Sequence, residues 1–266
     1  MFLADYHTHT EYSIDGEGPL DAMCEKAIAE GLEELAITDH MDIISGQSCD
    51  YWLPMDKSYP AIRAAKERYA GRLRVVIGVE LGEPMANPAA ADEFFRRVPD
   101  LDFVIGSIHN MENDLDVFYY NWKKHDPAAT YRHYLEWLTD FAENYDYDVL
   151  GHLTYPLRYM AEAGITLDLK PYYDQFENLF RIAVRRDKGI ELNVSGLRQA
   201  MKTTMPTPEI LQLYHDCGGR ILTIGSDAHR AADIGAHLTD GLDIARSCGF
   251  TEIASYTRRV PVFRSI

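Results

Sequence analysis

FLADYHTHTEYSIDG, residues 2–16, places two histidines directly after a short apolar run. The run itself, residues 2–6, is typical of a buried strand. His7 and His9 follow at its end, and residues at i and i+2 of an extended segment point to the same side. Asp15 comes next in an Asp-Gly pair, which by itself signals a turn. The stretch therefore predicts a strand that ends in two imidazoles able to bind one metal ion.

Strands and amphipathic helices alternate along the rest of the chain. Short β-branched runs give the expected strands, at residues 2–6, 34–38, 73–80, 102–109, 148–152, 190–196 and 220–229. Helical periodicity gives the expected helices, at residues 19–31, 59–72, 87–98, 126–145, 171–189, 207–219 and 232–249. The last residues, 250–266, are rich in β-branched and aromatic side chains and predict a short added strand or a tail.

This alternation indicates an α/β fold with parallel strands, because each helix carries the chain back to the start of the next strand. Units of this size suit a β/α barrel better than an open sheet, although periodicity alone does not separate the two. No Gly-, Ser- or Pro-rich linker interrupts the pattern, so we expect a single domain over residues 1–266.

The composition narrows the class of protein. The formal charge of −16 at pH 7 disfavours nucleic-acid binding, because an acidic surface repels phosphate backbones. No run approaches the roughly 18 apolar residues of a membrane span, and no signal peptide is evident, so we expect a cytoplasmic protein. The four cysteines form no C-x-x-C pair and are expected to be reduced thiols: Cys24, Cys49, Cys217 and Cys248.

Residues that bind metals gather where the expected strands end. They are His7, His9, His40, Glu80, His109, His152, Asp227 and His229. The carboxyl ends of parallel barrel strands share one mouth, so these side chains would converge there. Neutral imidazole and carboxylate suit zinc, iron and manganese alike. Any one of them could be a core or capping residue, but their shared placement favours a metal cluster.

Two further groups of residues have other expected roles. Asp39 could cap a turn or orient the adjacent His40. The remaining histidines fall at a helix start or within helical patterns and are expected to be solvated or structural: His125, His133, His215 and His237.

The ordered motifs HTH, TDH, GVE, GSIH, GHL, LNVSGL and GSDAH resemble the polymerase-and-histidinol-phosphatase (PHP) family of metallophosphoesterases, most closely its histidinol-phosphatase branch. The likeness covers residue 5 to about residue 235. It implies a distorted, TIM-like parallel barrel of about seven strands that holds two to three divalent ions (Zn, Mn or Fe) at its carboxyl-terminal mouth.

The resemblance also implies a division of the ligands. The first ion would be bound by His7, His9, Glu80 and Asp227. Glu80 would bridge to a second ion bound by His109 and His152. A third ion would be bound by His40, His229 and Asp15. Several relatives carry a histidine at the position of Asp15. A carboxylate is a competent ligand at this position, so the Asp-Gly turn would present Asp15 to the third ion.

The implied reaction is hydrolysis of a small phosphate monoester, L-histidinol phosphate, by a metal-bridging hydroxide. Asp227 would hold the ion and the hydroxide, and His229 or a metal-bound water would assist the leaving alkoxide. Arg158, expected in a loop at the mouth, would bind the phosphate through its bidentate fork. Arg198, Ser107 and Asn193 are further candidate substrate contacts. The aromatic run at residues 118–122 could wall the pocket or simply pack in the core.

Other activities fit parts of this pattern. A sister phosphatase of the family would act on a nucleotide 3′-phosphate or on phosphotyrosine. A proofreading nuclease is disfavoured by the acidic charge. A metal-binding scaffold without catalysis is disfavoured because open, carboxylate-rich sites are costly for a purely structural role. Nothing in the sequence indicates the oligomeric state.

Overall fold

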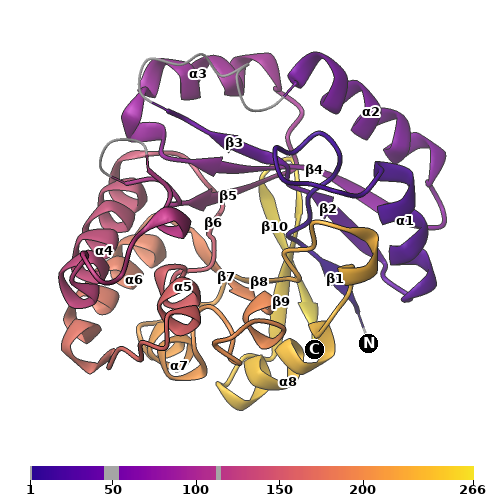
Figure 1. Cartoon of the computed structure of the whole chain (residues 1–266). Helices are drawn as coiled ribbons and strands as arrows, with labels where there is room; N and C mark the ends of the chain where they lie inside the picture. Colours follow the sequence, from indigo (N-terminus) through magenta and orange to yellow (C-terminus); the bar gives the residue numbers. More distant parts are fainter. Residues whose placement is uncertain (1, 45–53, 112–114) are drawn as a thin grey trace.

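Parallel strands form the wall of a barrel, with the helices around it (Figure 1). The computed structural model describes residues 2–44, 54–111 and 115–266. Within these residues the parallel strands are β1 Ala4–Asp5, β2 Glu34–Ile37, β3 His40–Asp42, β4 Arg74–Gly82, β5 Phe103–Ser107, β6 Val149–Leu150, β7 Gly189–Asn193 and β8 Leu222–Gly225. They hydrogen-bond in the order β1-β2-β4-β5-β6-β7-β8, and β3 pairs with β4.

The barrel closes where the segment after β1 meets β8 and the residues that follow β8. Tyr6 N donates to Ile224 O (3.0 Å), and Asp227 N donates to His7 O (2.9 Å). Thr8 and Ala228 form a parallel bridge between the same segments. This closure confirms the predicted α/β barrel and sets His7 beside Asp227, more than 200 residues apart in the sequence.

The second strand of the wall is broken in a way that the sequence did not reveal. β2 ends at Ile37, and β3 resumes the pairing with β4 in the register His40↔Glu80. Between them, the buried Asp39 carboxylate accepts hydrogen bonds from Thr10 N (2.6 Å) and Thr10 Oγ1 (3.0 Å). This contact joins two segments that are 29 residues apart in the sequence. Asp39 thus anchors the segment that follows His9 and brings His40 beside Glu80.

The helices follow the predicted order with shifted ends. Within the described residues they are α1 Leu20–Ala29, α2 Met55–Arg68, α3 Pro88–Arg97, α4 Pro127–Asn144, α5 Pro156–Glu162, α6 Tyr173–Arg185, α7 Pro208–Asp216 and α8 Leu238–Ser247. α2 begins four residues before the prediction, because Met55 and Tyr59 bury the same face as Ile62. α8 begins later than predicted, because His237 adopts a left-handed conformation (φ 63°).

α5 corrects one prediction. Arg158 lies in this helix and not in a loop. Tyr155 precedes the helix with αR backbone angles, and Pro156 occupies its first turn, where a missing N–H costs nothing. The short Pro-initiated helix therefore presents Arg158 from a rigid element at the barrel mouth.

The carboxyl-terminal residues form an antiparallel hairpin, β9 Glu252–Thr257 and β10 Val260–Ser265, which extends the prediction of a short strand or tail. Its first strand helps to close a small core inside the barrel, made of Ala4, Tyr6, Ala36, Val76, Phe103, Ile105, Val149, Ala254 and Tyr256. A larger core fills the layer between the wall and the helices. The hairpin thus blocks the end of the barrel opposite the mouth (Figure 1).

Arg259 at the hairpin turn holds this closure. Its Nε donates to Asp148 Oδ2 (2.5 Å), and its backbone N donates to Asp102 O (2.9 Å). Arg259→Met should lower the free energy of unfolding by about 1–3 kcal/mol, because the buried Asp148 carboxylate loses its closest cation. Urea unfolding measures this. Arg181→Met, which removes an exposed pair with Glu177, should change stability by less than about 0.5 kcal/mol. If the two variants lose the same stability, the Arg259–Asp148 pair contributes no more than an exposed ion pair does.

Two smaller findings complete the fold. None of the described helices is long and apolar enough to cross a membrane. Cys24 lies in α1, while Cys217 and Cys248 directly follow α7 and α8, and these three are free thiols. Cys49 lies outside the described residues.

Candidate metal centre

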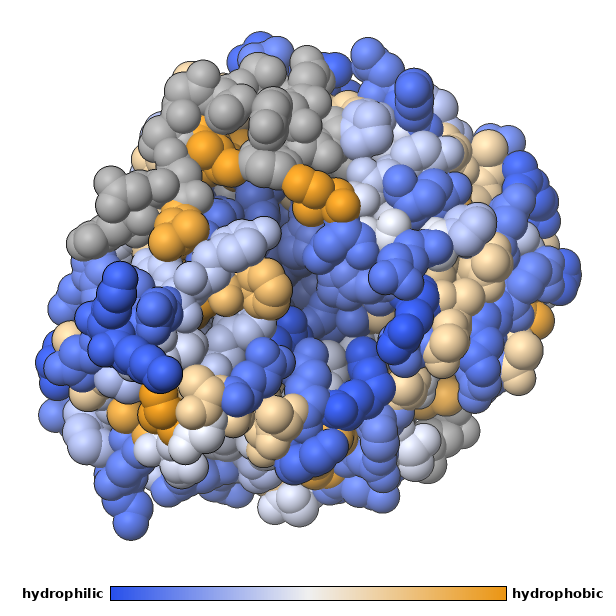
Figure 2. Space-filling view, viewed as in Figure 1, coloured by the Kyte–Doolittle hydropathy of each residue, from blue (hydrophilic) through white to orange (hydrophobic). Residues whose placement is uncertain are grey.

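A cavity of about 490 Å³ opens at the carboxyl ends of the strands. Figure 2 shows it as a hollow whose floor is hydrophilic, with hydrophobic side chains at its edge. It is lined by Ile14, Asp15, His40, Asp42, Ile44, Glu80, His109, Asn110, Asp116, Phe118, Tyr119, His152, Tyr155, Arg158, Tyr159, Asp227 and His229. His7 and His9 lie buried beside it. The predicted convergence of strand-end ligands therefore occurs.

Glu80 lies at the centre of the cluster and is fully buried. Its Oε2 lies 3.1 Å from His7 Nε2, 3.5 Å from His9 Nε2 and 3.0 Å from His40 Nδ1. Its Oε1 lies 2.8 Å from His152 Nε2 and 3.2 Å from His109 Nε2. One carboxylate therefore presents each oxygen to a different set of imidazoles, which is the arrangement that a bridging ligand requires.

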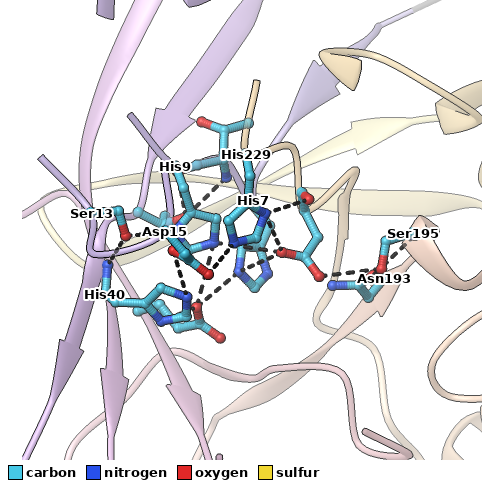
Figure 3. Close-up of polar contacts among 12 residues, drawn as sticks. His7, His9, Ser13, Asp15, His40, Asn193, Ser195 and His229 are labelled. Atoms are coloured by element: carbon cyan, nitrogen blue, oxygen red, sulfur yellow. Dashed lines mark hydrogen bonds and ion pairs between the residues drawn. The ribbon is translucent and has the colours of Figure 1, made fainter. Parts of the chain in front are cut away.

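A second group of side chains lies closer to solvent. Asp15 Oδ2 is 3.0 Å from His229 Nε2, and Asp15 Oδ1 is 3.6 Å from His40 Nε2. The rings of His9 and His229 stack with centroids 4.2 Å apart. Ser13 contacts His9 Nδ1 (3.3 Å) and accepts from His40 N (3.0 Å), so the turn before Asp15 is tied to the imidazoles (Figure 3). The structure thus brings Asp15 to the site despite its half-exposed side chain.

Asp227 connects the cluster to the predicted phosphate-binding arginine. Its Oδ1 lies 3.5 Å from His9 Nε2 and 3.6 Å from His229 Nδ1. Its Oδ2 accepts from Arg158 Nη2 (2.8 Å) and lies 3.2 Å from Ser195 Oγ. Asp227 has a left-handed backbone (φ 54°), which is unusual for a residue other than glycine and costs conformational energy. Asp227 therefore faces the imidazoles with one oxygen and Arg158 with the other.

Glu191, which the sequence analysis overlooked, orients two of the histidines. Its Oε1 lies 2.7 Å from His7 Nδ1, and its Oε2 accepts from His152 N (2.9 Å). With Nδ1–H donating to Glu191, His7 directs the lone pair of Nε2 toward Glu80. A carboxylate that fixes a metal-binding histidine in this way is common in metalloproteins.

Asp42 and Glu83 were also overlooked. Asp42 Oδ1 lies 3.2 Å from His109 Nδ1, and Asp42, His40 and His109 together could hold an ion. Glu83 is buried, has a left-handed backbone (φ 46°) and accepts from His109 N (2.5 Å) and Asn110 N (3.0 Å). Both carboxylates therefore fix the position of His109.

The electrostatics of the cluster fit a cation. Burial favours protonated Glu80, but His7, His40 and His109 outweigh it and hold the pKa of Glu80 well below its usual value. Burial, with His229 and His40, lowers the pKa of His9 to about 3, so this imidazole is neutral. The surrounding carboxylates outweigh burial and raise the pKa of His7, His40 and His109 well above its usual value, so a metal ion would take the place of the protons on these imidazoles.

Buried atoms without hydrogen-bond partners support the same conclusion. Within the described residues, His7 Nε2, His9 Nε2, His40 Nδ1 and Glu80 Oε2 make no hydrogen bond of acceptable geometry. Orphaned buried polar atoms are rare, because each one costs about 1–3 kcal/mol. Four of them directed at one another fit a shared metal ion. Groups that could hold an ion include His9-Asp15-His40-His229, His7-Glu80-His152 and His7-His9-Asp227.

The other predicted substrate contacts lie behind the cavity lining. Ser107 donates to Glu80 Oε1 (2.6 Å), and Asn193 Oδ1 accepts from Ser195 Oγ (2.6 Å; Figure 3). Arg198 donates to Ser226 O (2.9 Å). All three support residues of the cluster from outside, and direct contact with substrate stays a prediction for them. The four histidines predicted to be solvated or structural lie outside the groups of ligands described above.

Glu191→Gln should weaken metal binding about tenfold to a hundredfold, because the amide no longer stabilises the ligating tautomer and orientation of His7. Titration of the metal-free protein, followed by calorimetry, measures the affinity. Glu34→Gln is the matched control, since Glu34 is a buried glutamate at the opposite end of the barrel, bonded to Tyr6 and Arg74. If both variants weaken metal binding equally, Glu191 acts only through general stability.

Known proteins are similar to this chain over nearly its whole length. The PHP domain family matches residues 5–195. A histidinol-phosphatase of Lactococcus lactis is 26% identical over 262 residues, which cover 97% of this chain and 95% of that protein. A probable histidinol-phosphatase of Thermotoga maritima is 28% identical over 261 residues, which cover 95% of each chain.

A solved structure shows the same fold. The crystal structure of the L. lactis histidinol phosphate phosphatase in complex with zinc, L-histidinol and phosphate aligns with a TM-score of 0.83 and 24% identity over 98% of each chain. The family match itself covers well over half of this chain and contains most of the predicted ligands. The protein therefore belongs to the PHP domain family.

Proposed function

We propose that this protein is a metal-dependent phosphoric monoester hydrolase that converts L-histidinol phosphate to L-histidinol and phosphate. The observation that carries the proposal is Glu80, whose two oxygens face two sets of buried imidazoles next to an arginine able to bind phosphate. The relatives named histidinol-phosphatase, with which the chain aligns end to end, support the choice of substrate.

Two to three divalent ions would be held by His7, His9, Asp15, His40, Glu80, His109, His152, Asp227 and His229, with zinc, manganese and iron all compatible with the donors. When bound, such ions polarise the phosphoryl oxygens and lower the pKa of bound water. The residues of the chain then supply binding, orientation and proton transfer.

Arg158 would bind the phosphate. Its guanidinium is positioned by Asp227 Oδ2 and Ser195 Oγ, both 2.8 Å from Nη2, and packs over the Tyr155 ring at 5.4 Å. A partly buried arginine with fixed geometry gives bidentate recognition of phosphate oxygens at little entropic cost. This positive group lines the cavity of an otherwise acidic protein, which supports its assignment to the substrate anion.

Asp227 and His229 would take part in proton transfer. Oδ1 of Asp227 faces the imidazoles, while Oδ2 is fixed by Arg158, so this carboxylate is oriented to hold the attacking water. The His229 side chain is 30% exposed at the cavity edge, where it can give a proton to the leaving alkoxide. The free thiols described above agree with a cytoplasmic location.

Phosphate release from L-histidinol phosphate, a nucleotide 3′-phosphate and phosphotyrosine, measured together with metal content, tests the proposal. We expect the highest kcat/KM for L-histidinol phosphate, loss of activity with a chelator, and recovery on addition of zinc or manganese. Preference for either alternative substrate, or full activity in the metal-free protein, would contradict it.

A further inference from the structure

One side of the cavity is an aromatic wall that leads away from the metal cluster. The Tyr155 ring lies against the His109 and His152 rings, with centroids 5.1 Å and 4.9 Å apart. The Tyr155 hydroxyl points outward to Tyr159 OH (3.0 Å) and to Asp116 Oδ1 (3.2 Å). The wall therefore begins at the ligands and ends at a carboxylate.

Asp116 differs from the other carboxylates of the cavity. Among the described lining residues, Asp15, Asp42, Glu80 and Asp227 each contact an imidazole or a guanidinium. The contacts of Asp116 are with neutral donors, Phe118 N (2.7 Å) and Tyr155 OH. Among the described residues that line the cavity, Asp116 is therefore the carboxylate with no cationic side chain at contact distance. Its partial burial makes that state costly unless a cation binds there.

The surroundings of Asp116 suit an organic cation. It caps the 3-10 helix Val117–Tyr119, which carries Phe118 and Tyr119 to the edge of the cavity. Phe118 is 55% exposed and packs edge-on against Tyr159 at 5.4 Å. An ammonium group gains from a carboxylate and from the faces of neighbouring aromatic rings together.

We propose that Asp116, with Phe118 and Tyr159, binds the ammonium group of the substrate and so determines specificity. This inference rests on the proposed function, and it divides the cavity into a phosphate end at Arg158 and a cation end at Asp116. L-Histidinol phosphate carries an anionic phosphate and an ammonium group, and its ammonium stays largely charged near neutral pH, whereas its imidazole is largely neutral.

The same carboxylate would exclude competing monoesters. Phosphotyrosine within a peptide lacks a free ammonium beside the ring, and a nucleotide brings a further polar sugar and base. Neither offers the cation that Asp116 requires, so each leaves a half-buried charge unbalanced. Selection would therefore arise from the cost of leaving Asp116 without a cation as well as from the contact with the correct substrate.

The test compares L-histidinol phosphate with 3-(imidazol-4-yl)propyl phosphate, which lacks only the ammonium group. In the wild-type protein we expect kcat/KM to favour L-histidinol phosphate. Asp116→Asn should reduce the ratio of the two kcat/KM values about tenfold to a hundredfold, as expected for a hydrogen bond to a charged group. Asn and Ser both cap helices, so Asp116→Ser gives a second variant that keeps the bond to Phe118 N.

Asp126→Asn is the matched control. Asp126 also caps a helix, accepting from Ala128 N and Ala129 N, and is exposed away from the cavity. It should leave the ratio unchanged. A ratio unaltered in both Asp116 variants, whether or not the individual rates fall, would overturn the inference. Failure of the wild-type protein to hydrolyse L-histidinol phosphate would instead overturn the proposed function, which separates the two failures.

Discussion

Glu80→Gln is expected to reduce kcat/KM for L-histidinol phosphate by about a thousandfold or more and to lower the metal content of the purified protein. The change is isosteric, but it removes the negative charge shared by two sets of histidines. Glu80 Oε2 faces His7, His9 and His40, and Oε1 faces His109 and His152. An amide presents one neutral oxygen donor and one NH2 group that cannot bind a cation, so one ion position loses its ligand and the other keeps only a weaker one.

Metal analysis and steady-state kinetics on the same preparation measure the two effects together. Circular dichroism and urea unfolding establish that the variant is folded. Glu34→Gln, the buried glutamate at the other end of the barrel, should keep both its metal and its activity. A Glu80→Gln protein with full metal content and wild-type kcat/KM would exclude a bridging role for this carboxylate.

The barrel could be predicted because its wall has a simple pattern. Apolar runs such as 73–80 and 102–109 alternate with amphipathic helices, and this order favours a sheet of parallel strands. Two features could not be read in this way. The break at Asp39 depends on a hydrogen bond to Thr10, almost 30 residues earlier. The hairpin depends on Arg259 reaching Asp148, over 100 residues earlier. Both are set by tertiary contacts, on which local periodicity carries no information.

The ligands at the strand ends could be predicted for the same reason, whereas the residues that orient them could not. Glu191 lies inside a strand, where its side chain is buried. A charged residue within an apolar strand was the signal in the sequence, since a buried carboxylate needs a partner. Asp42 follows His40 by two residues, the same spacing that identified His7 and His9. Such spacing within β3 could be recognised only once the break before this strand was known.

Asp227→Asn is expected to reduce turnover by about a thousandfold to ten-thousandfold while the protein stays folded. His7, His9 and Arg158 outweigh the burial of Asp227 and hold its pKa well below the usual value, so it acts as an anion. Asparagine keeps the shape and can still accept from Arg158 Nη2, which preserves the local geometry. It lacks the charge needed to bind a cation and to hold a proton of the attacking water.

Ser195→Ala separates the charge of Asp227 from its positioning. The Ser195 hydroxyl lies 3.2 Å from Asp227 Oδ2 and accepts from Arg158 Nη2 (2.8 Å), so its removal loosens both groups but leaves the carboxylate ionised. A hydrogen bond to a charged group corresponds to about a tenfold to hundredfold effect, so the loss should be smaller than for Asp227→Asn. Turnover at saturating substrate and the urea midpoint are measured for both variants. If Asp227→Asn kept more than about a tenth of wild-type turnover, the negative charge of Asp227 would not be essential. Another group would then have to transfer the proton, and His229 would be the next residue to test.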